Sequence, residues 1–138
     1  FWRIKNGKDA AMSGYAAKPR ALTWSPDSKW LLTGGSSEVV GWNFSGGGPE
    51  GSPPLLMDYH RNTVTHLALN PRTRWLASGC KQHDVALWHA ITDALPAYVF
   101  SMEAPLAGLR WCNTPSRSLL AAVDESGYVG LWAIEEVH

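Results

Sequence analysis

The 138-residue sequence has no long apolar run, little cysteine and no excess of either charge. Its apolar runs extend over only a few residues, whereas a membrane-spanning helix needs about 20. Twelve basic residues balance twelve acidic ones, which argues against a nucleic-acid or membrane-binding surface built on positive charge. We therefore expect neither a nucleic acid nor a membrane as a partner.

The sequence also lacks the motifs of several enzyme classes. Cys80 and Cys112 are too few for a disulfide framework, and free thiols are typical of a reducing compartment, so we expect a cytoplasmic location. No G-x-S-x-G motif marks a nucleophilic serine. The glycine-rich segment 45–54 lacks the Lys-Ser/Thr ending of a phosphate-binding loop. We expect no catalytic residue, no cofactor and no metal site.

Tryptophan, in contrast, is abundant, with eight residues. Four similar segments contain one each, namely FWRI (1–4), GWNF (41–44), LWHA (87–90) and LWAI (131–134), with steps of 40, 46 and 44 residues between the tryptophans. Pro26, Pro71 and Pro115 precede the last three of them by 16, 17 and 17 residues. Because two independent landmarks keep the same phase, the sequence predicts an internal repeat.

Each repeat contains several short strand patterns separated by turns. The segments ALTW (21–24), HLAL (66–69) and GLRW (108–111) alternate in polarity, as half-buried strands do. A turn follows, then a second apolar segment, a polar loop, a third strand with the landmark Trp and a weaker fourth strand. Four short strands in 40–46 residues are typical of a propeller blade. For residues 8–18 a helix is the alternative, but Gly14 and the preceding Asn-Gly pair favour a strand.

Residues 60–88 resemble a repeat of the WD-repeat β-propeller family over nearly their whole length, and residues 22–35 are a second good match. The positions that carry the resemblance are His60, Val64, Leu67, Leu69, Pro71, Leu76, Ala77, Ser78, Gly79, Val85, Leu87 and Trp88. The resemblance implies an all-β fold, a partial β-propeller of about three four-stranded antiparallel blades plus half a blade.

On this resemblance the chain is a single arc of a propeller. We expect residues 1–17 to hold the outer strands of a truncated blade, 18–60 and 61–103 to form full blades, and 104–138 to form a blade without its outer strand. Since a closed ring typically takes 4–8 blades, we expect a fragment of a longer protein. The remaining blades or a second copy would then close the ring, and the sequence leaves their total number open.

The resemblance also implies a hydrogen-bonded set inside each blade, made of a loop His, a strand Ser or Thr, a turn Asp and the closing Trp. The residues placed in it are His60, Ser78 and Trp88 in the middle repeat, Thr33 and Trp42 in the first, and Trp132 in the last. Tyr15 occupies the His position of the first repeat, and Gln82 stands where the acid is expected, with Asp84 two positions later. The last repeat has Met102, Ala122 and Ser126 instead.

By resemblance, the chain is expected to be a non-catalytic scaffold that binds proteins through loops on one rim. These rim loops are about 16–20, 36–38, 59–63, 81–84, 103–107 and 124–127. Arg, Tyr and Trp dominate many interfaces, and charges select among partners. The binding candidates are Arg20, Tyr59, Arg61 and His83, with Glu38, Lys81, Asp84 and Glu125 as charged selectors.

Two alternatives of other classes stay open. One is a ligand-binding or enzymatic propeller whose site needs blades outside this sequence. The other is a metal-handling protein that uses Cys80, His83 and His89, because Cys and His at short spacing are common zinc ligands.

Overall fold

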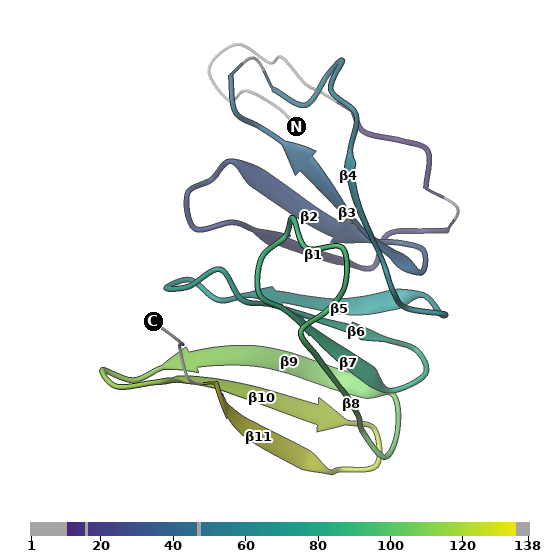
Figure 1. Cartoon of the computed structure of the whole chain (residues 1–138). Coiled ribbons are helices and arrows are strands. Elements are labelled where there is room, and N and C mark those ends of the chain that lie inside the picture. The colour runs from purple at the N-terminus through teal and green to yellow at the C-terminus, as the bar shows by residue number, and fades with distance from the viewer. Residues whose placement is uncertain (1–10, 16, 47, 135–138) are drawn as a thin grey trace.

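The computed structural model describes residues 11–15, 17–46 and 48–134 of the chain. Within these ranges eleven β-strands form three antiparallel sheets, and none of the described residues is helical. Nothing in this part of the chain therefore provides a helix long and apolar enough to span a bilayer. Figure 1 shows the three sheets stacked one after another in chain order.

Each sheet is a meander in which neighbouring strands follow one another along the chain. The first sheet contains β1 (Ala21–Trp24), β2 (Trp30–Gly34), β3 (Glu38–Asn43) and β4 (Leu55–Asp58). The second contains β5 (Val64–Leu69), β6 (Leu76–Cys80), β7 (Asp84–Trp88) and β8 (Tyr98–Ser101). The third contains β9 (Leu106–Asn113), β10 (Ser118–Asp124) and β11 (Val129–Ile134).

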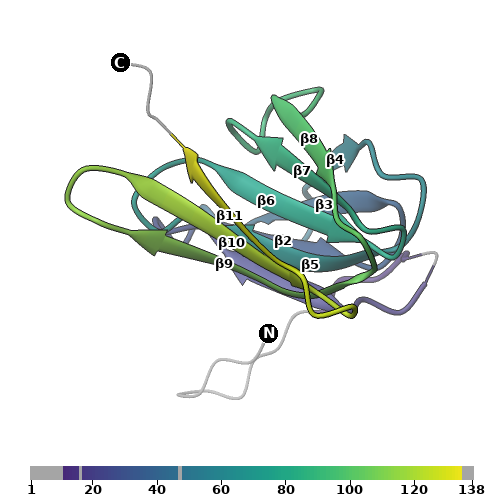
Figure 2. The ribbon, with the colours of Figure 1, turned by 90° about the horizontal axis from the view of Figure 1, so that it is seen from below.

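The first strands of the three sheets, β1, β5 and β9, lie next to one another and contact each other in turn. In the view from below they run side by side, while β4 and β8 lie away from them (Figure 2). Sheets that share an inner edge in this way are the blades of a β-propeller, so the predicted all-β propeller fold is confirmed. The third sheet has three strands among the described residues, and the blade boundaries expected from the sequence stay predictions.

The segment before β1 differs from its prediction. Phe1–Ile4 and the Asn6-Gly7 turn lie outside the described residues, so the truncated blade expected there is not tested. Residues 11–15, where a fourth strand was expected, form neither a strand nor the alternative helix. Instead Gly14 has a φ of 98°, a backbone conformation that favours glycine, and Tyr15 turns in against the first sheet.

Two apolar cores hold the stack together, one in each joint between sheets. Between the first and second sheets, Leu32, Val39 and Met57 pack against side chains that include Leu76 and Trp88. Between the second and third sheets lies a core of Trp75, Ala77, Val85, Leu87, Met102, Leu106, Leu109, Leu120 and Ala122. Every residue of β6 is buried because its two faces contribute to both cores. Burial of this apolar surface is the main stabilising contribution to the joints.

Glycines let the sheets approach closely at the inner edge. A Cβ on Gly34 would lie 2.7 Å from Cγ1 of Val64, the first residue of β5. A Cβ on Gly79 would likewise meet Leu106, the first residue of β9. In both sheets the glycine therefore lies against the first residue of the next sheet, where a side chain would clash. In the third sheet the same place, directly after Ala122, is occupied by Val123.

Candidate functional site

The second sheet contains a buried set of three polar side chains centred on Ser78. The indole Nε1–H of Trp88 donates to Ser78 Oγ over 2.9 Å, and Nε2 of His60 lies 2.8 Å from the same oxygen. All three residues are buried. Because Ser78 accepts from Trp88, its own proton is free to bond the ring nitrogen of a neutral His60. The set links the loop before β5 to β6 and β7.

Burial lowers the pKa of His60 to about 4, against an opposing effect of the Asp84 charge. The ring is therefore neutral at pH 7. No described residue bonds its Nδ1 atom, which is buried. Asp84, which stands near the expected acid position, accepts instead from the hydroxyl of Ser101 over 2.8 Å. The fourth member of the family pattern is thus not replaced by Asp84, and Gln82 is exposed.

In the first sheet Tyr15 completes the equivalent set. The indole Nε1–H of Trp42 donates to the Tyr15 hydroxyl over 2.7 Å, and this hydroxyl also bonds Oγ1 of Thr33. The Tyr15 hydroxyl thus joins Thr33 to Trp42, whereas in the second sheet the Ser78 hydroxyl joins His60 to Trp88. The segment before β1 is held to the sheet by these bonds.

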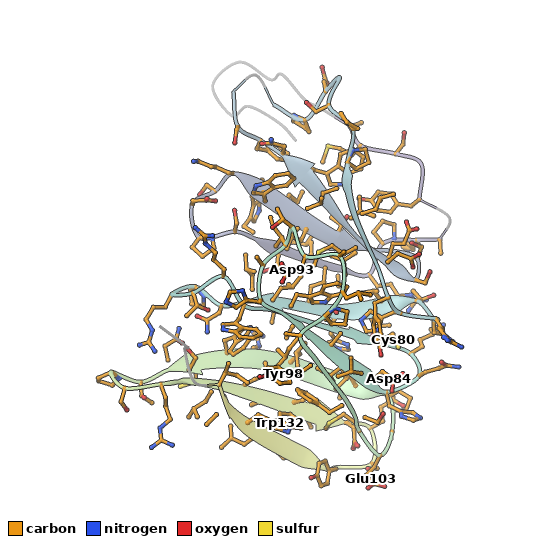
Figure 3. The ribbon with its side chains drawn as sticks, viewed as in Figure 1. Cys80, Asp84, Asp93, Tyr98, Glu103 and Trp132 are labelled. Atoms are coloured by element: carbon orange, nitrogen blue, oxygen red, sulfur yellow. The ribbon has the colours of Figure 1, made fainter. Side chains whose placement is uncertain are left out.

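The third sheet replaces the polar set by apolar packing and a carboxylate. Met102 and Ala122 are buried, and Trp132 stacks on Phe100 with ring centroids 4.5 Å apart (Figure 3). The loop before β9 is held by Asp124, whose Oδ2 accepts from the backbone N–H groups of Glu103 and Ala104, each over 3.1 Å. The sequence reading missed this role of Asp124.

Asp124 also fixes the turn between β10 and β11. Its Oδ1 accepts from the backbone and hydroxyl of Ser126 and from the backbone N–H of Tyr128. Burial alone would raise the pKa of Asp124, but these hydrogen bonds outweigh it and hold the pKa below its usual value. An Asp directly before Glu-Ser-Gly is a turn signal that the sequence does contain.

The rim loops lie at one edge of the stack, and Figure 3 shows Cys80, Asp84 and Glu103 along that edge. Three of the eight predicted binding residues, Arg20, Lys81 and Glu125, line one recess of about 590 Å³. Backbone hydrogen bonds position each of them, from Arg20 to Gly34 (2.8 Å), from Lys81 to Thr63 (3.0 Å) and from Glu125 to Pro105 (2.9 Å). The structure thus brings these three together.

The other five predicted residues are distributed differently. Tyr59 is half-buried, with its ring edge-on to His60 at 5.4 Å and to Trp88 at 6.3 Å. His83 has a φ of 64° and a buried, unbonded Nδ1, and Asp84 is bonded to Ser101. Arg61 is exposed, whereas Glu38 lines a separate recess with Tyr15 and Trp42.

The candidate metal ligands do not converge. His83 precedes β7 and His89 follows it, so about 20 Å of extended backbone separates the Cα atoms of the two residues. The ring of His89 lies edge-on to Trp75 at 5.0 Å, and Cys80 is buried. Among the described residues no group of three His, Cys, Asp or Glu side chains is placed to hold a metal ion.

Comparison with known proteins agrees with the fold. Residues 10–43 and 51–89, more than half of the chain, match the family model of the WD domain, G-beta repeat. A subunit of the target of rapamycin complex from Schizosaccharomyces pombe, wat1, is 24% identical over 137 residues. That match covers 99% of this chain and 42% of the relative, so the chain spans less than half of the relative's length.

Several solved structures are similar to the chain. Their sequence identity to it is low, so the similarity concerns the fold alone. A chain in the mitotic checkpoint complex has a TM-score of 0.76 at 20% identity, covering 96% of this chain and 39% of that one. The computationally designed protein Ika8 has a TM-score of 0.75 at 18% identity, covering 96% and 38%. The β-propeller domain of Cps50 (Swd1) from Myceliophteria thermophila has a TM-score of 0.60 at 17% identity, covering 88% and 39%.

Proposed function

The chain belongs to the WD-repeat family, and on this premise we propose that it is a non-catalytic scaffold that binds protein partners through its rim loops. Proteins of this family serve in general as platforms for protein interaction. The S. pombe relative is named as a subunit of a complex, which supports a protein as partner.

The observation that carries the proposal is the rigid presentation of exposed charges on the rim. Arg20, Lys81 and Glu125 project from backbone that hydrogen bonds hold in place. A loop that is already ordered loses little conformational entropy when a partner binds. The buried sets around Ser78 and Thr33 and the carboxylate of Asp124 hold the neighbouring loops in the same way.

Substitution on the two rims tests the proposal. We would compare Arg61→Ala/His83→Ala with Arg117→Ala, which changes an exposed residue in the turn between β9 and β10 at the opposite edge. Proteins bound by the immobilised chain from extract would be quantified by mass spectrometry. We expect at least one stoichiometric protein to be lost from the double variant and kept by Arg117→Ala. An identical set of proteins on all variants would contradict binding through this rim.

A second proposal concerns how the arc of three sheets would be completed to a closed propeller ring. The chain spans 42% of the S. pombe relative, and its first and third sheets each present an outer face with exposed apolar side chains, among them Leu22 and Leu131. We propose that the remaining blades of a longer protein, or a second copy of the chain, cover these faces.

A further inference from the structure

The structure concentrates positive charge in one place on a chain that is neutral overall. The recess that holds Arg20, Lys81 and Glu125 also contains Lys18. It continues along the inner strands into a second recess of about 610 Å³, which shares Arg20, Thr65 and His66 with the first and adds Arg110. The two recesses are therefore lined by four basic residues and one acidic residue, whereas the whole sequence has twelve of each sign.

Apart from Glu125, none of the described acidic residues lines either recess. Lys18, Arg20, Lys81 and Arg110 are exposed. Within the part of the chain that the structure describes, none of the four side chains forms an ion pair. Among the described residues these four side chains are therefore available to interact with a negatively charged ligand.

The backbone that carries the charges comes from three sheets but is fixed. A Cβ on Gly35 would lie 2.8 Å from Cα of Pro19, so the segment with Lys18 and Arg20 packs tightly on the end of β2. Lys81 follows Cys80, the end of β6, which Figure 3 labels. Arg110 lies in the middle of β9. The basic residues thus lie before β1, after β6 and within β9.

Thr65 and His66 line both recesses, together with apolar residues such as Leu106 in the first and Leu109 in the second. Burial lowers the pKa of His66, an effect that a backbone hydrogen bond at Ala107 partly offsets, so the ring adds no charge at pH 7. Its Nδ1 lies 2.9 Å from Oγ1 of Thr65. A ligand that enters here meets basic side chains and the polar side chains of Thr65 and His66.

From this arrangement we infer that the rim recess binds an acidic segment of a protein partner. The segment is an extended stretch with several Asp or Glu side chains, and it lies along the inner strands β1, β5 and β9. The recess extends along three adjacent strands, which suits an extended segment with successive carboxylates. Glu125 at its edge repels a further carboxylate and so limits the acidic stretch. This inference rests on the proposed scaffold function for its place on the rim.

A labelled hexaglutamate peptide tests the inference by fluorescence anisotropy with the whole 138-residue chain. Each exposed ion pair supplies little free energy, so reversal of one cation, in Arg20→Glu or Lys81→Glu, is expected to weaken binding roughly 2- to 30-fold. Glu125→Gln removes the repulsion and is expected to tighten binding roughly 2- to 5-fold. Added salt weakens binding because the charges are exposed.

The control Arg117→Glu makes the same charge change at the opposite rim and is expected to leave the affinity unchanged. Circular dichroism and tryptophan fluorescence establish that each variant keeps its fold. Equal loss of affinity in Arg117→Glu, or no binding of the hexaglutamate peptide, would overturn the inference. Binding of a six-uridine RNA as tightly as the peptide would also overturn it, because the recess would then accept any polyanion.

The outcome of the peptide experiment can be distinguished from the outcome of the extract experiment. If a protein from extract binds the rim but is retained by Arg20→Glu and Lys81→Glu, the scaffold stands and the acidic segment is wrong. If hexaglutamate binds as described while no protein is lost from the rim variants, the positive recess stands and the scaffold is wrong.

Discussion

Thr33, Ser78 and Ala122 occupy equivalent positions in the three sheets. The side chain at this position determines which contacts hold the preceding loop to the sheet. In the second sheet the Ser78 hydroxyl bridges the closing Trp88 to the ring of His60 from the loop. In the first sheet Thr33 bonds the hydroxyl of Tyr15, which itself accepts from the closing Trp42. Where Ala122 removes the hydroxyl, the loop side chain is the apolar Met102, and the polar connection moves to Asp124. A buried hydroxyl without its partners would cost free energy, so the members of a set change together.

Acid is expected to destabilise the chain through His60. In the unfolded chain a His binds a proton below about pH 6.5, whereas burial keeps the folded ring neutral down to a pKa of about 4. Between these values the unfolded state binds more protons, so the free energy of unfolding falls as the pH is lowered. A difference of this size corresponds to at most about 3 kcal/mol.

Urea unfolding at pH 7.5 and pH 4.5 measures this effect, with His60→Gln as the comparison. The variant keeps a hydrogen-bonding side chain but cannot titrate, so its loss of stability between the two pH values is expected to be smaller than that of the unchanged chain. All other titrating groups are shared and cancel in the comparison. An equal loss in both proteins would show that the pKa of His60 is not lowered.

At the scale of the strands, the joints between sheets depend on glycines that accept the first residue of the next sheet. Gly34→Ala is expected to destabilise the chain by about 1–3 kcal/mol, because crowding in a packed interior forces neighbours to move. The new Cβ would lie 2.9 Å from Cβ of Val64 and 3.1 Å from its carbonyl oxygen, so the backbone itself must shift. The midpoint of thermal unfolding measures the change.

Two further glycines are matched controls for Gly34→Ala. In Gly79→Ala the clash is with the end of the Leu106 side chain, which can rotate away, so a smaller loss is expected. In Gly108→Ala the Cβ meets no atom within 4 Å, and no loss is expected. Equal stability of Gly34→Ala and Gly108→Ala would contradict the close approach of β2 and β5.

The elements were largely predictable from the sequence, whereas several contacts were not. The spacing of Trp and Pro located all eleven strands, because local polarity and turn residues determine them. The strand expected within residues 8–18 was wrong in its described part, where Tyr15 bonds Thr33 and Trp42 instead. The grouping of Lys18, Arg20, Lys81 and Arg110 depends on how three sheets meet, which the order of residues along the chain does not reveal.

For the whole molecule, the open outer faces of the first and third sheets predict self-association. Leu22, Trp24 and Leu56 are exposed on the first sheet, and Val129 and Leu131 on the third, with exposed fractions of 47–67%. Contiguous apolar surface of this kind favours association in water. Sedimentation velocity at tens of micromolar is expected to show dimers or larger species in exchange with the monomer.

A charged substitution on one of these faces tests whether its exposed apolar side chains cause the association. Leu131→Lys places a cation on the third sheet and is expected to shift the sedimentation profile towards the monomer, while Leu95→Lys, an exposed change in the loop before β8, leaves it unaltered. A folded chain that stays strictly monomeric at these concentrations would contradict the prediction.

Gly34, Gly79 and Val123 occupy equivalent positions in the three sheets. The joint behind the third sheet would therefore differ in shape from the two joints inside the arc. Val64 and Leu106 fit because the residue opposite each has no side chain, but a blade placed behind the third sheet in the same manner would meet the isopropyl group of Val123. Such a blade must begin with a smaller residue or sit farther out. A blade that followed the third sheet would therefore have to differ at this joint from the second and third sheets, because Val123 carries an isopropyl group where Gly34 and Gly79 have no side chain.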